Sequence, residues 1–302
     1  MPGLPMGAGV GVPACREDML ESINGFQVLR KIAESNTAEI FHVVRLVGRG
    51  RGSEYAAKVL REAFARDATE RDHIENEYRI CSTLDHPNLV HAFEVQMAAA
   101  RPFVVLDMIA GPSLRQYLEK GRPPLADALG WLAQVAEGLA YLHEKGYVHR
   151  DVKPQNTVVG DNGNVKVIDF ALATEQDSSF GKHVLRRLKE HRRPGTWSYM
   201  SPEQIRNERL TGQTDVYSLG VSTFEVATGR LPYVSTTSQG LLEQHLYGLV
   251  PSVRVTRPEA PLELDEFIRA MMAKDPLDRP MNMLYVSAKL NDLAKLCVSI
   301  RD

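Results

Sequence analysis

Two short segments carry the residue types that could do chemistry. Residues 149–156 read HRDVKPQN, and residues 165–170, VKVIDF, follow closely. Each residue alone has an ordinary structural explanation, but Asp169 lies in an apolar run, where burying a carboxylate is costly unless a cation meets it. A magnesium ion would provide that cation, and Asn156 could supply a second hard oxygen ligand.

Together these residue types suit phosphoryl transfer. That reaction needs metal ions that neutralise phosphates, a cation on the non-transferred phosphates, and a carboxylate that orients the attacking hydroxyl. Asp151 suits the last role, and Lys153 could balance charge on the moving phosphoryl group. Lys58, within YAAKVL, could be the cation, because its apolar neighbours predict that it points inward. Glu75 or Glu77, in a nearby helical stretch, could hold it.

Short apolar runs must position the N-terminal part of this set. From Phe26 to about Leu106 the runs are rich in Val, Ile and Phe and are bounded by Gly, Asn and Pro, which predicts strands. One helix is expected over residues 67–84. Glycines at 48, 50 and 52 predict a hairpin turn between two strands.

Beyond residue 111 the apolar period becomes helical, with spacings of three and four at Leu132, Val135, Leu139 and Leu142. Gly146 would end this helix. Further helices are expected over 216–226, which is apolar on most sides and therefore buried, and over 264–274 and 283–296. We expect a small strand-rich lobe, a connector at 107–112, a larger helical lobe, and a ligand cleft between them.

Composition sets the broad class. The 302 residues are 43% hydrophobic and 25% charged, as in ordinary globular proteins. Lys and Arg number 36 against 38 Asp and Glu, so no charge excess predicts nucleic acid or membrane-surface binding. The three cysteines are far apart, and a reduced, cytoplasmic setting is expected. No apolar run approaches the roughly 20 residues that cross a bilayer, and residues 1–15 lack the basic start of a signal peptide.

The spacing of the motifs resembles the protein kinase family over about residues 26–296. Its motifs recur in order as Lys58, Glu77 ahead of HPNLV, LDMIAGPSL, HRDVKPQN, Asp169-Phe170, GTWSYMSPE, Asp215 in TDVYSLG, and Arg279 in DPLDRP. The resemblance implies an α+β, two-lobed protein-kinase-like fold, with one main helix in the β-rich N-lobe and a mainly helical C-lobe. Residues 1–25 would be a flexible leader to a kinase domain at 26–302, with the N-lobe at 26–106, the hinge at 107–112 and the C-lobe at 113–302.

The same resemblance implies a serine/threonine protein kinase that moves the γ-phosphoryl of Mg-ATP onto protein hydroxyls. Lys153-Pro154 and Thr196 resemble the serine/threonine branch. The expected cofactors are ATP and Mg²⁺, with Mn²⁺ as the other metal considered. The expected partner is a protein substrate, without nucleic acid and without a membrane segment, and no oligomeric state is assigned.

The resemblance also assigns residues. Lys58 and Glu77 would pair, Asp151 would be the catalytic base assisted by Lys153, and two residues would hold the metal, namely Asn156 and Asp169. The ATP-binding residues would be Ile32, Ala33, Ser35, Ala38, Ile40, Ala57, Lys58, Leu106, Asp107, Ile109, Asn156, Val158 and Asp169. Within that set Leu106 would guard the back pocket, and backbone groups of Asp107 and Ile109 would meet the adenine. Structural roles would fall to the Glu203–Arg279 ion pair and to Asp215, which would brace the catalytic loop.

The chain departs from the family pattern in the phosphate-covering loop. The segment Ile32–Ile40 has Ala33, Ser35 and Ala38 where the family has glycines. Conformations that only glycine reaches cheaply would be lost or strained, at about 1 kcal/mol per site. We predict looser ATP binding and a less closed loop, not an absent site.

Two further departures follow. Ala171 replaces the glycine after Asp169-Phe170, which predicts a stiffer backbone with the metal ligand kept. The next segment is basic, with Lys182, Arg186, Arg187, Lys189, Arg192 and Arg193. It is either a solvated loop or a patch that attracts an acidic substrate or partner. Glu190 could serve Arg150 in place of a phosphate, and Ser178 and Ser179 are candidate autophosphorylation sites.

Two alternative hypotheses remain. The missing glycines would suit a pseudokinase, a nucleotide-binding scaffold or partner-binding module, although such a protein has little need of Lys58, Asp151, Asn156 and Asp169 together. A small-molecule kinase of similar fold is disfavoured by GTWSYMSPE and Asp215, which resemble the protein-substrate branch.

Overall fold

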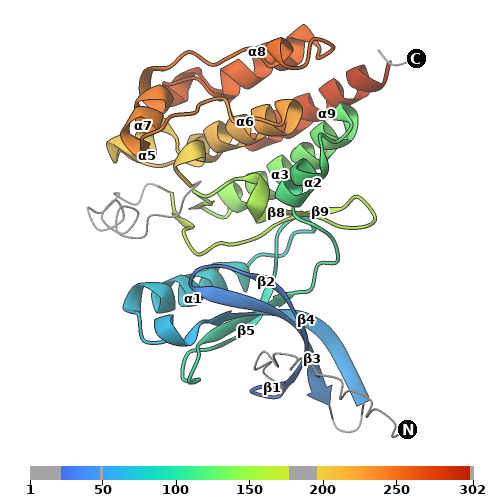
Figure 1. The fold of residues 1–302 in the computed structure, drawn as a ribbon, viewed down its shortest axis with the longest axis vertical. Helices are drawn as coiled ribbons and strands as arrows, with labels where there is room; N and C mark the ends of the chain where they lie inside the picture. Colours follow the sequence, from blue (N-terminus) through green and yellow to red (C-terminus); the bar gives the residue numbers. More distant parts are fainter. Residues whose placement is uncertain (1–21, 48–49, 177–195, 300–302) are drawn as a thin grey trace, which may run out of the picture.

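The computed structural model describes residues 22–47, 50–176 and 196–299, which form two lobes stacked along the long axis (Figure 1). The small lobe contains a six-stranded antiparallel sheet in the order β1-β2-β3-β4-β6-β5. Its elements are β1 (Ser22–Ile23), β2 (Phe26–Glu34), β3 (Ala38–Val47), β4 (Gly50–Leu60), α1 (Ala68–Cys81), β5 (Ala92–Gln96) and β6 (Phe103–Asp107).

The large lobe is mainly helical and carries short strand pairs on the side that faces the small lobe (Figure 1). Its helices are α2 (Leu114–Lys120), α3 (Leu125–Glu144), α5 (Pro202–Arg206), α6 (Gly212–Thr228), α7 (Ser238–Tyr247), α8 (Leu262–Met271) and α9 (Met283–Ser299). Its strands are β7 (Tyr147–Val148), β8 (Thr157–Val159), β9 (Val165–Val167) and β10 (Thr174–Glu175). The two-lobed α+β prediction is therefore confirmed.

The sheet begins four residues before the expected boundary at Phe26. Ser22 pairs with Gln27 and Ile23 with Phe26. Between them Asn24 has φ 36° and Gly25 has φ 86°. Positive φ at both central residues is what a type I′ hairpin requires, and Asn-Gly is its preferred sequence. Residues 22–25 thus belong to the sheet rather than to a flexible leader, and residues 1–21 lie outside the described part.

The main helix of the small lobe follows from its N-cap. The Asp67 side chain accepts hydrogen bonds from the amides of Thr69 and Glu70, at 2.9 and 3.0 Å. Such a cap satisfies amides that have no partner within the helix. Helix α1 lies within the predicted range of 67–84. Strands β3 and β4 pair antiparallel up to Val47 and Gly50, as a hairpin requires, and residues 48–49 are outside the described part.

Helix α6 is the centre of the large lobe, and every residue from Thr214 to Thr228 is buried. Its hydroxyl groups bond back to carbonyls four residues earlier, as Ser222 does to Ser218 at 2.9 Å, so polar side chains are tolerated inside the core. A Cβ on Gly220 would lie 2.9 Å from the Cβ of Met271, so glycine lets α8 pack closely. The predicted buried helix is confirmed.

Helix α3 ends at Glu144, and Gly146 follows with φ 83° and donates a hydrogen bond from its amide to the carbonyl oxygen of His143. The predicted stop at Gly146 is correct. Helices α2, α5 and α7 were not expected from the sequence. Across the described ranges, no helix combines the length and the apolar character that crossing a membrane requires.

Candidate active site

A cleft of about 810 Å³ lies between the lobes and gathers most of the predicted site. Twelve of the thirteen predicted ATP-binding residues line it, namely Ile32, Ala33, Ser35, Ala38, Ile40, Lys58, Leu106, Asp107, Ile109, Asn156, Val158 and Asp169. Glu77 and Lys153 line it as well. These residues come from β2, β3, β4, α1, the connector and the loops around β8 and β9.

Ala57 is the exception, and its assignment to the cleft is wrong. Its side chain packs in the apolar cluster on the other face of the sheet, with Phe41 and Val105. Ala56 lines the cleft instead. Side chains alternate between the two faces of a strand, so the residue two before Lys58, not one before it, shares its face.

Lys58 lies between two carboxylates inside the cleft. Its Nζ donates to Glu77 Oε2 at 2.7 Å and to Asp169 Oδ1 at 2.8 Å. The partner on α1 is therefore Glu77, while Glu75 is exposed on the same helix. These contacts join β4, α1 and the segment after β9, so the cation predicted from YAAKVL is held by both lobes.

The electrostatics of this cluster favour a charged lysine. Burial alone would lower the pKa of Lys58, but Asp169 and Glu77 outweigh it, so the pKa lies above its usual value. Burial also raises the pKa of Glu77, against the opposing effect of Lys58, and the Asp169 charge raises it further. The arrangement concentrates negative charge around one cation, as a site for a metal-bound polyphosphate requires.

Asp169 is held in an uncommon backbone conformation, with φ 67°. Non-glycine residues occupy this region only where their surroundings fix them. The next residue, Phe170, is fully buried and packs edge-on against His149, with ring centroids 4.7 Å apart. This packing anchors the segment beneath the cleft and leaves the Asp169 side chain at its surface.

Asp151 is buried, and its carboxylate is surrounded by hydrogen-bond donors. Lys153 Nζ lies 2.8 and 2.6 Å from its two carboxylate oxygens, and Asn156 Nδ2 lies 2.9 Å from Oδ2. Asn156 Nδ2 also donates to the backbone oxygen of Asp151 at 2.9 Å. Three residues of the HRDVKPQN motif thus form one hydrogen-bonded cluster at the large-lobe side of the cleft.

The loop that carries Asp151 is held by hydrogen bonds to the Asp215 carboxylate of α6. This carboxylate accepts from the amides of His149 and Arg150, each at 2.8 Å, and from His143 Nε2 at 2.8 Å. Burial would raise the pKa of Asp215, but these donors lower it below its usual value. The geometry fits the bracing role that the resemblance implies.

The phosphate-loop segment is a tight hairpin tip between β2 and β3. The Ser35 amide donates to the Ala38 carbonyl at 2.7 Å, and Ser35 Oγ accepts from the Ala38 amide at 3.0 Å. Arg61 fixes it from outside, donating to the Ser35 carbonyl and to Glu34 at 2.9 Å each. None of residues 32–40, all of them described, has a positive φ. The glycine conformations are therefore absent rather than strained.

The connector joins the lobes through a polar contact that the sequence did not reveal. Asp107 Oδ2 accepts from Lys166 Nζ at 2.8 Å and from the His91 amide at 3.1 Å. At Gly111, with φ 148°, a Cβ would lie 2.1 Å from the carbonyl oxygen of Val159, so only glycine fits. The connector is thus held against β5 and β9 and lies close to β8.

The cleft lining also includes residues that the sequence did not single out, among them Ala56, Met108 and Ile168. Strand alternation from Lys58 could have found Ala56, and the LDMIAG connector could have suggested Met108. Ile168 faces the cleft directly before Asp169, and an apolar run gives no sign of which side chain turns outward.

The donor set fits a hard divalent cation. Among the described residues no three His, Cys, Asp or Glu side chains form a metal cluster, so the chain itself would provide few ligands. Both amide hydrogens of Asn156 are used by Asp151, so its oxygen is the atom left to coordinate a cation. This oxygen and the Asp169 carboxylate suit Mg²⁺, which takes few protein ligands and shares the phosphates of a nucleotide.

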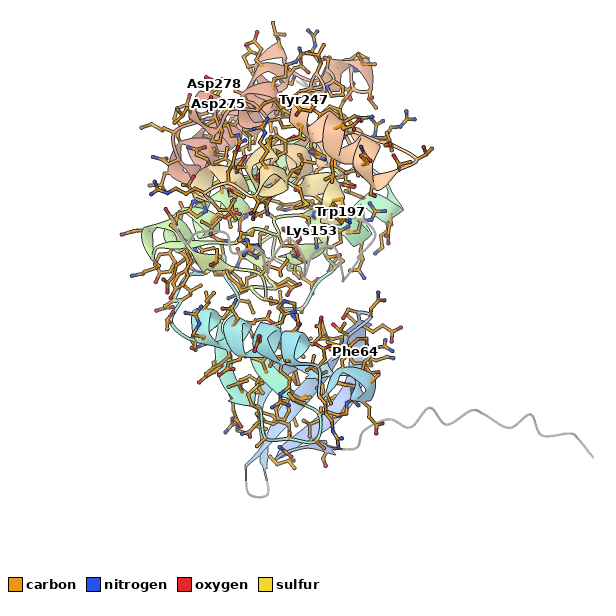
Figure 2. The ribbon with its side chains drawn as sticks, turned by 90° about the vertical axis from the view of Figure 1, so that its left-hand side faces the viewer. Phe64, Lys153, Trp197, Tyr247, Asp275 and Asp278 are labelled. Carbon is orange, nitrogen blue, oxygen red and sulfur yellow. The ribbon has the colours of Figure 1, made fainter. Side chains whose placement is uncertain are left out.

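Figure 2 shows Lys153 on the large-lobe side of the cleft, with Trp197 close to it in this view and Phe64 across in the small lobe.

The predicted structural ion pair forms, with Arg279 nitrogens 2.8 and 2.9 Å from the two carboxylate oxygens of Glu203. The described residues do not include three features singled out in the sequence, namely the basic cluster at 182–193, Glu190, and the serines at 178 and 179.

Comparisons with known proteins agree with this geometry. A family model described as "Protein kinase domain" matches residues 26–289. Serine/threonine-protein kinase PrkC of Bacillus subtilis is 31% identical over 255 residues, which is 84% of this chain and 38% of PrkC. Serine/threonine-protein kinase PknL of Mycobacterium tuberculosis is 31% identical over 294 residues, which is 94% of this chain and 70% of PknL.

Among solved structures, the PknI kinase domain of Mycobacterium tuberculosis superimposes with a TM-score of 0.67 at 22% identity. The match covers 90% of this chain and 97% of that one. At this identity the likeness concerns the fold. The chain spans little more than a third of the length of PrkC.

Proposed function

The chain belongs to the protein kinase domain family, and from this premise we propose that it is an active serine/threonine protein kinase. The reaction would transfer the γ-phosphoryl of Mg·ATP to Ser and Thr hydroxyls of protein substrates. The observation that carries the proposal is that one cleft is lined by Lys58, paired with Glu77 and Asp169, and by Lys153 and Asn156, which both hydrogen-bond to Asp151.

These residues suit an in-line displacement at phosphorus. The substrate hydroxyl oxygen bonds to the γ-phosphorus while the bond from that phosphorus to the β–γ bridging oxygen breaks, and ADP leaves. Asp151 orients the hydroxyl and takes its proton. Lys153, already paired with Asp151, balances charge on the transferred group, and Lys58 balances charge on the phosphates that stay behind.

Asn156 and Asp169 would hold the divalent metal that the family uses, and we propose Mg²⁺, with Mn²⁺ as a substitute. When bound, the metal neutralises charge on the phosphates. The backbone of Asp107 and Ile109 would meet the adenine, beside Ala56 and Leu106, because all four line the cleft.

A nucleotide-binding scaffold has no observation in its favour. Lys58, Asn156 and Asp169 line one cleft, and Asp151 is hydrogen-bonded to two residues of that lining, Lys153 and Asn156. The missing glycines leave a well-formed hairpin rather than a collapsed site. The named relatives are serine/threonine protein kinases, which disfavours a small-molecule kinase.

The test is phosphate incorporation from γ-labelled ATP into a generic protein substrate, with Mg²⁺ and with Mn²⁺. Asp151→Asn is the matched control, because it keeps the shape of the side chain and removes the base. We expect incorporation by the wild type alone, and nucleotide binding by both. Equal background in both proteins with either metal, despite nucleotide binding, would support a scaffold instead.

Two finer statements rest on the sequence. We propose that the basic residues at 182–193 favour acidic protein substrates, which a comparison of acidic and basic peptides would test. A faster rate on basic peptides would contradict it. The cytoplasmic setting expected from the three scattered cysteines remains a prediction.

A further inference from the structure

Asn76, on α1 directly before Glu77, contacts the segment that follows Asp169. Its Nδ2 lies 3.3 Å from the carbonyl oxygen of Phe170, 3.1 Å from that of Ala171 and 2.9 Å from that of Ala173. Two amide hydrogens are thus shared among three carbonyl oxygens, and each of those oxygens can only accept.

The orientation of this amide is settled by chemistry. Arg79 donates to Asn76 Oδ1 at 2.8 Å, and a guanidinium can only donate. The atom beside Arg79 must therefore be the oxygen, so the nitrogen faces the three carbonyls. Arg79 also reaches Glu175 of β10, at 3.9 Å, so it connects the helix to the far end of the same segment.

Adjacent residues of α1 therefore hold both kinds of backbone group in this segment. The Phe170 backbone lowers the pKa of Glu77, which also pairs with Lys58, while Asn76 donates to the carbonyls. Beyond the segment, Thr174 pairs with Val148, directly before the catalytic loop. The stretch from 170 to 173 is fixed to the small lobe by the helix and to the large lobe by β10.

The restraint matters because of the residue before it. Asp169 has φ 67°, a conformation that a non-glycine residue keeps only when neighbouring structure holds it. Its carboxylate would bind the metal, and Lys58 alone does not fix the backbone that presents it.

We propose that Asn76 is a positioning residue, which clamps the backbone of residues 170–173 to α1 and so holds the Asp169 carboxylate where the metal–nucleotide complex binds. This inference rests on the proposed function of the cleft. It assigns to a half-buried helix residue the coupling between the position of α1 and the orientation of the metal ligand.

The test compares Asn76→Leu and Asn76→Asp, which keep the shape of the side chain and remove its donors. Asn76→Asp also adds a charge, and Asn76→Leu does not, so a loss common to both reports the missing donors. Asn76→Gln keeps the amide on a longer side chain. Glu75→Gln changes the exposed neighbour on α1 and is the matched control, expected to behave as the wild type.

Two measurements are made on each protein. The first is the affinity for ATP, measured by calorimetry once in EDTA and once in Mg²⁺. The ratio of the two affinities gives the gain that the metal contributes, called here the metal-dependent gain. The second is kcat and KM for phosphate transfer. For Asn76→Leu and Asn76→Asp we expect the ATP affinity in EDTA to equal that of the wild type and the metal-dependent gain to be roughly tenfold smaller. We expect kcat to fall by a larger factor than KM rises. Asn76→Gln should recover part of both losses.

A metal-dependent gain and a kcat within twofold of the wild type in both variants would overturn the proposal. So would an equal loss of affinity with and without metal, because that would show damage to the whole cleft. The binding measurement needs no turnover. A wild type that binds nucleotide with a metal-dependent gain but transfers no phosphate would overturn the proposed function, while the Asn76 variants would still decide the positioning role.

Discussion

Lys58 Nζ lies 2.8 Å from Asp169 Oδ1, although 111 residues separate the two in the chain and they belong to different lobes. The contact is an ion pair that joins the two lobes within the cleft, and Glu77 joins it from α1 at 2.7 Å. One lysine therefore serves two carboxylates, and the stability of this region depends on its charge.

The first prediction concerns the loss of that charge. Lys58→Met should remove phosphate transfer and lower the free energy of unfolding by about 3 kcal/mol at pH 8, because the buried Glu77 and the half-buried Asp169 carboxylates are left without their cation. Burial already raises the pKa of Glu77, and the loss of the Lys58 charge, which lowers it, should raise it further. A carboxylate with a raised folded pKa destabilises the fold above its unfolded pKa, and this penalty disappears as falling pH protonates it.

The measurement is urea unfolding of Lys58→Met and wild type between pH 8 and pH 5. The difference in stability should narrow as the pH falls. A difference that stays constant over this range would show that the carboxylates do not depend on Lys58.

The contrast between predicted and observed elements has a physical basis. Helix α1 could be located because Asp67 caps it and a proline-containing segment follows it, and the catalytic motifs could be located because their spacing is local. The hairpin at Asn24-Gly25 could also have been predicted, since this dipeptide favours a type I′ turn, but it was assigned to the leader.

Other features depend on contacts that no local pattern encodes. The error at Ala57 is not of this kind, because strand alternation from Lys58 would have placed Ala56 on the cleft face instead. Asn76 was not singled out, since a polar residue on a helix usually faces solvent, and its carbonyl partners lie 94 to 97 residues later. The Asp107–Lys166 contact likewise joins residues 59 positions apart.

A second prediction concerns the hairpin tip. Ser35→Gly removes the hydroxyl that accepts from the Ala38 amide, and it restores backbone freedom at a position where the family has glycine. We expect ATP to bind roughly fivefold more tightly, which corresponds to about 1 kcal/mol. Ser35→Ala removes the hydroxyl without adding glycine freedom and should give a smaller gain. Titration of nucleotide with Mg²⁺ measures both, and weaker binding by Ser35→Gly would contradict the account.

A third prediction concerns Ala171, which has no positive φ and therefore carries an alanine without strain. Ala171→Gly should lower the free energy of unfolding by about 0.4–1 kcal/mol, because glycine gains more freedom in the unfolded chain. Denaturant midpoints at unchanged slope measure this, and amide exchange at Phe170 should become faster. A variant as stable and as protected as the wild type would show that alanine does not stiffen this segment.

The last prediction concerns pH and a histidine far from the cleft. His245 of α7 is fully buried, with Nδ1 2.9 Å from the hydroxyl of Tyr217 and its carbonyl 2.9 Å from Lys274 Nζ. Burial first, and then the Lys274 charge, lowers the pKa of His245 from 6.5 to about 3. Below pH 6.5 the unfolded chain therefore binds a proton at this histidine that the folded chain does not. As the pH decreases, the free energy of unfolding decreases by up to about 1.4 kcal/mol per pH unit.

His245→Gln should remove this contribution while it lowers stability at pH 7, because the glutamine cannot reproduce the packing against Tyr233, whose ring centroid lies 5.0 Å away. Urea unfolding at pH 7, 6, 5 and 4 gives the slope of stability against pH for each protein. The slope should be shallower in the variant, because it has no proton to bind at this position in the unfolded state. Parallel slopes would mean that another group governs the acid side of the stability curve and that His245 takes up its proton in the folded protein.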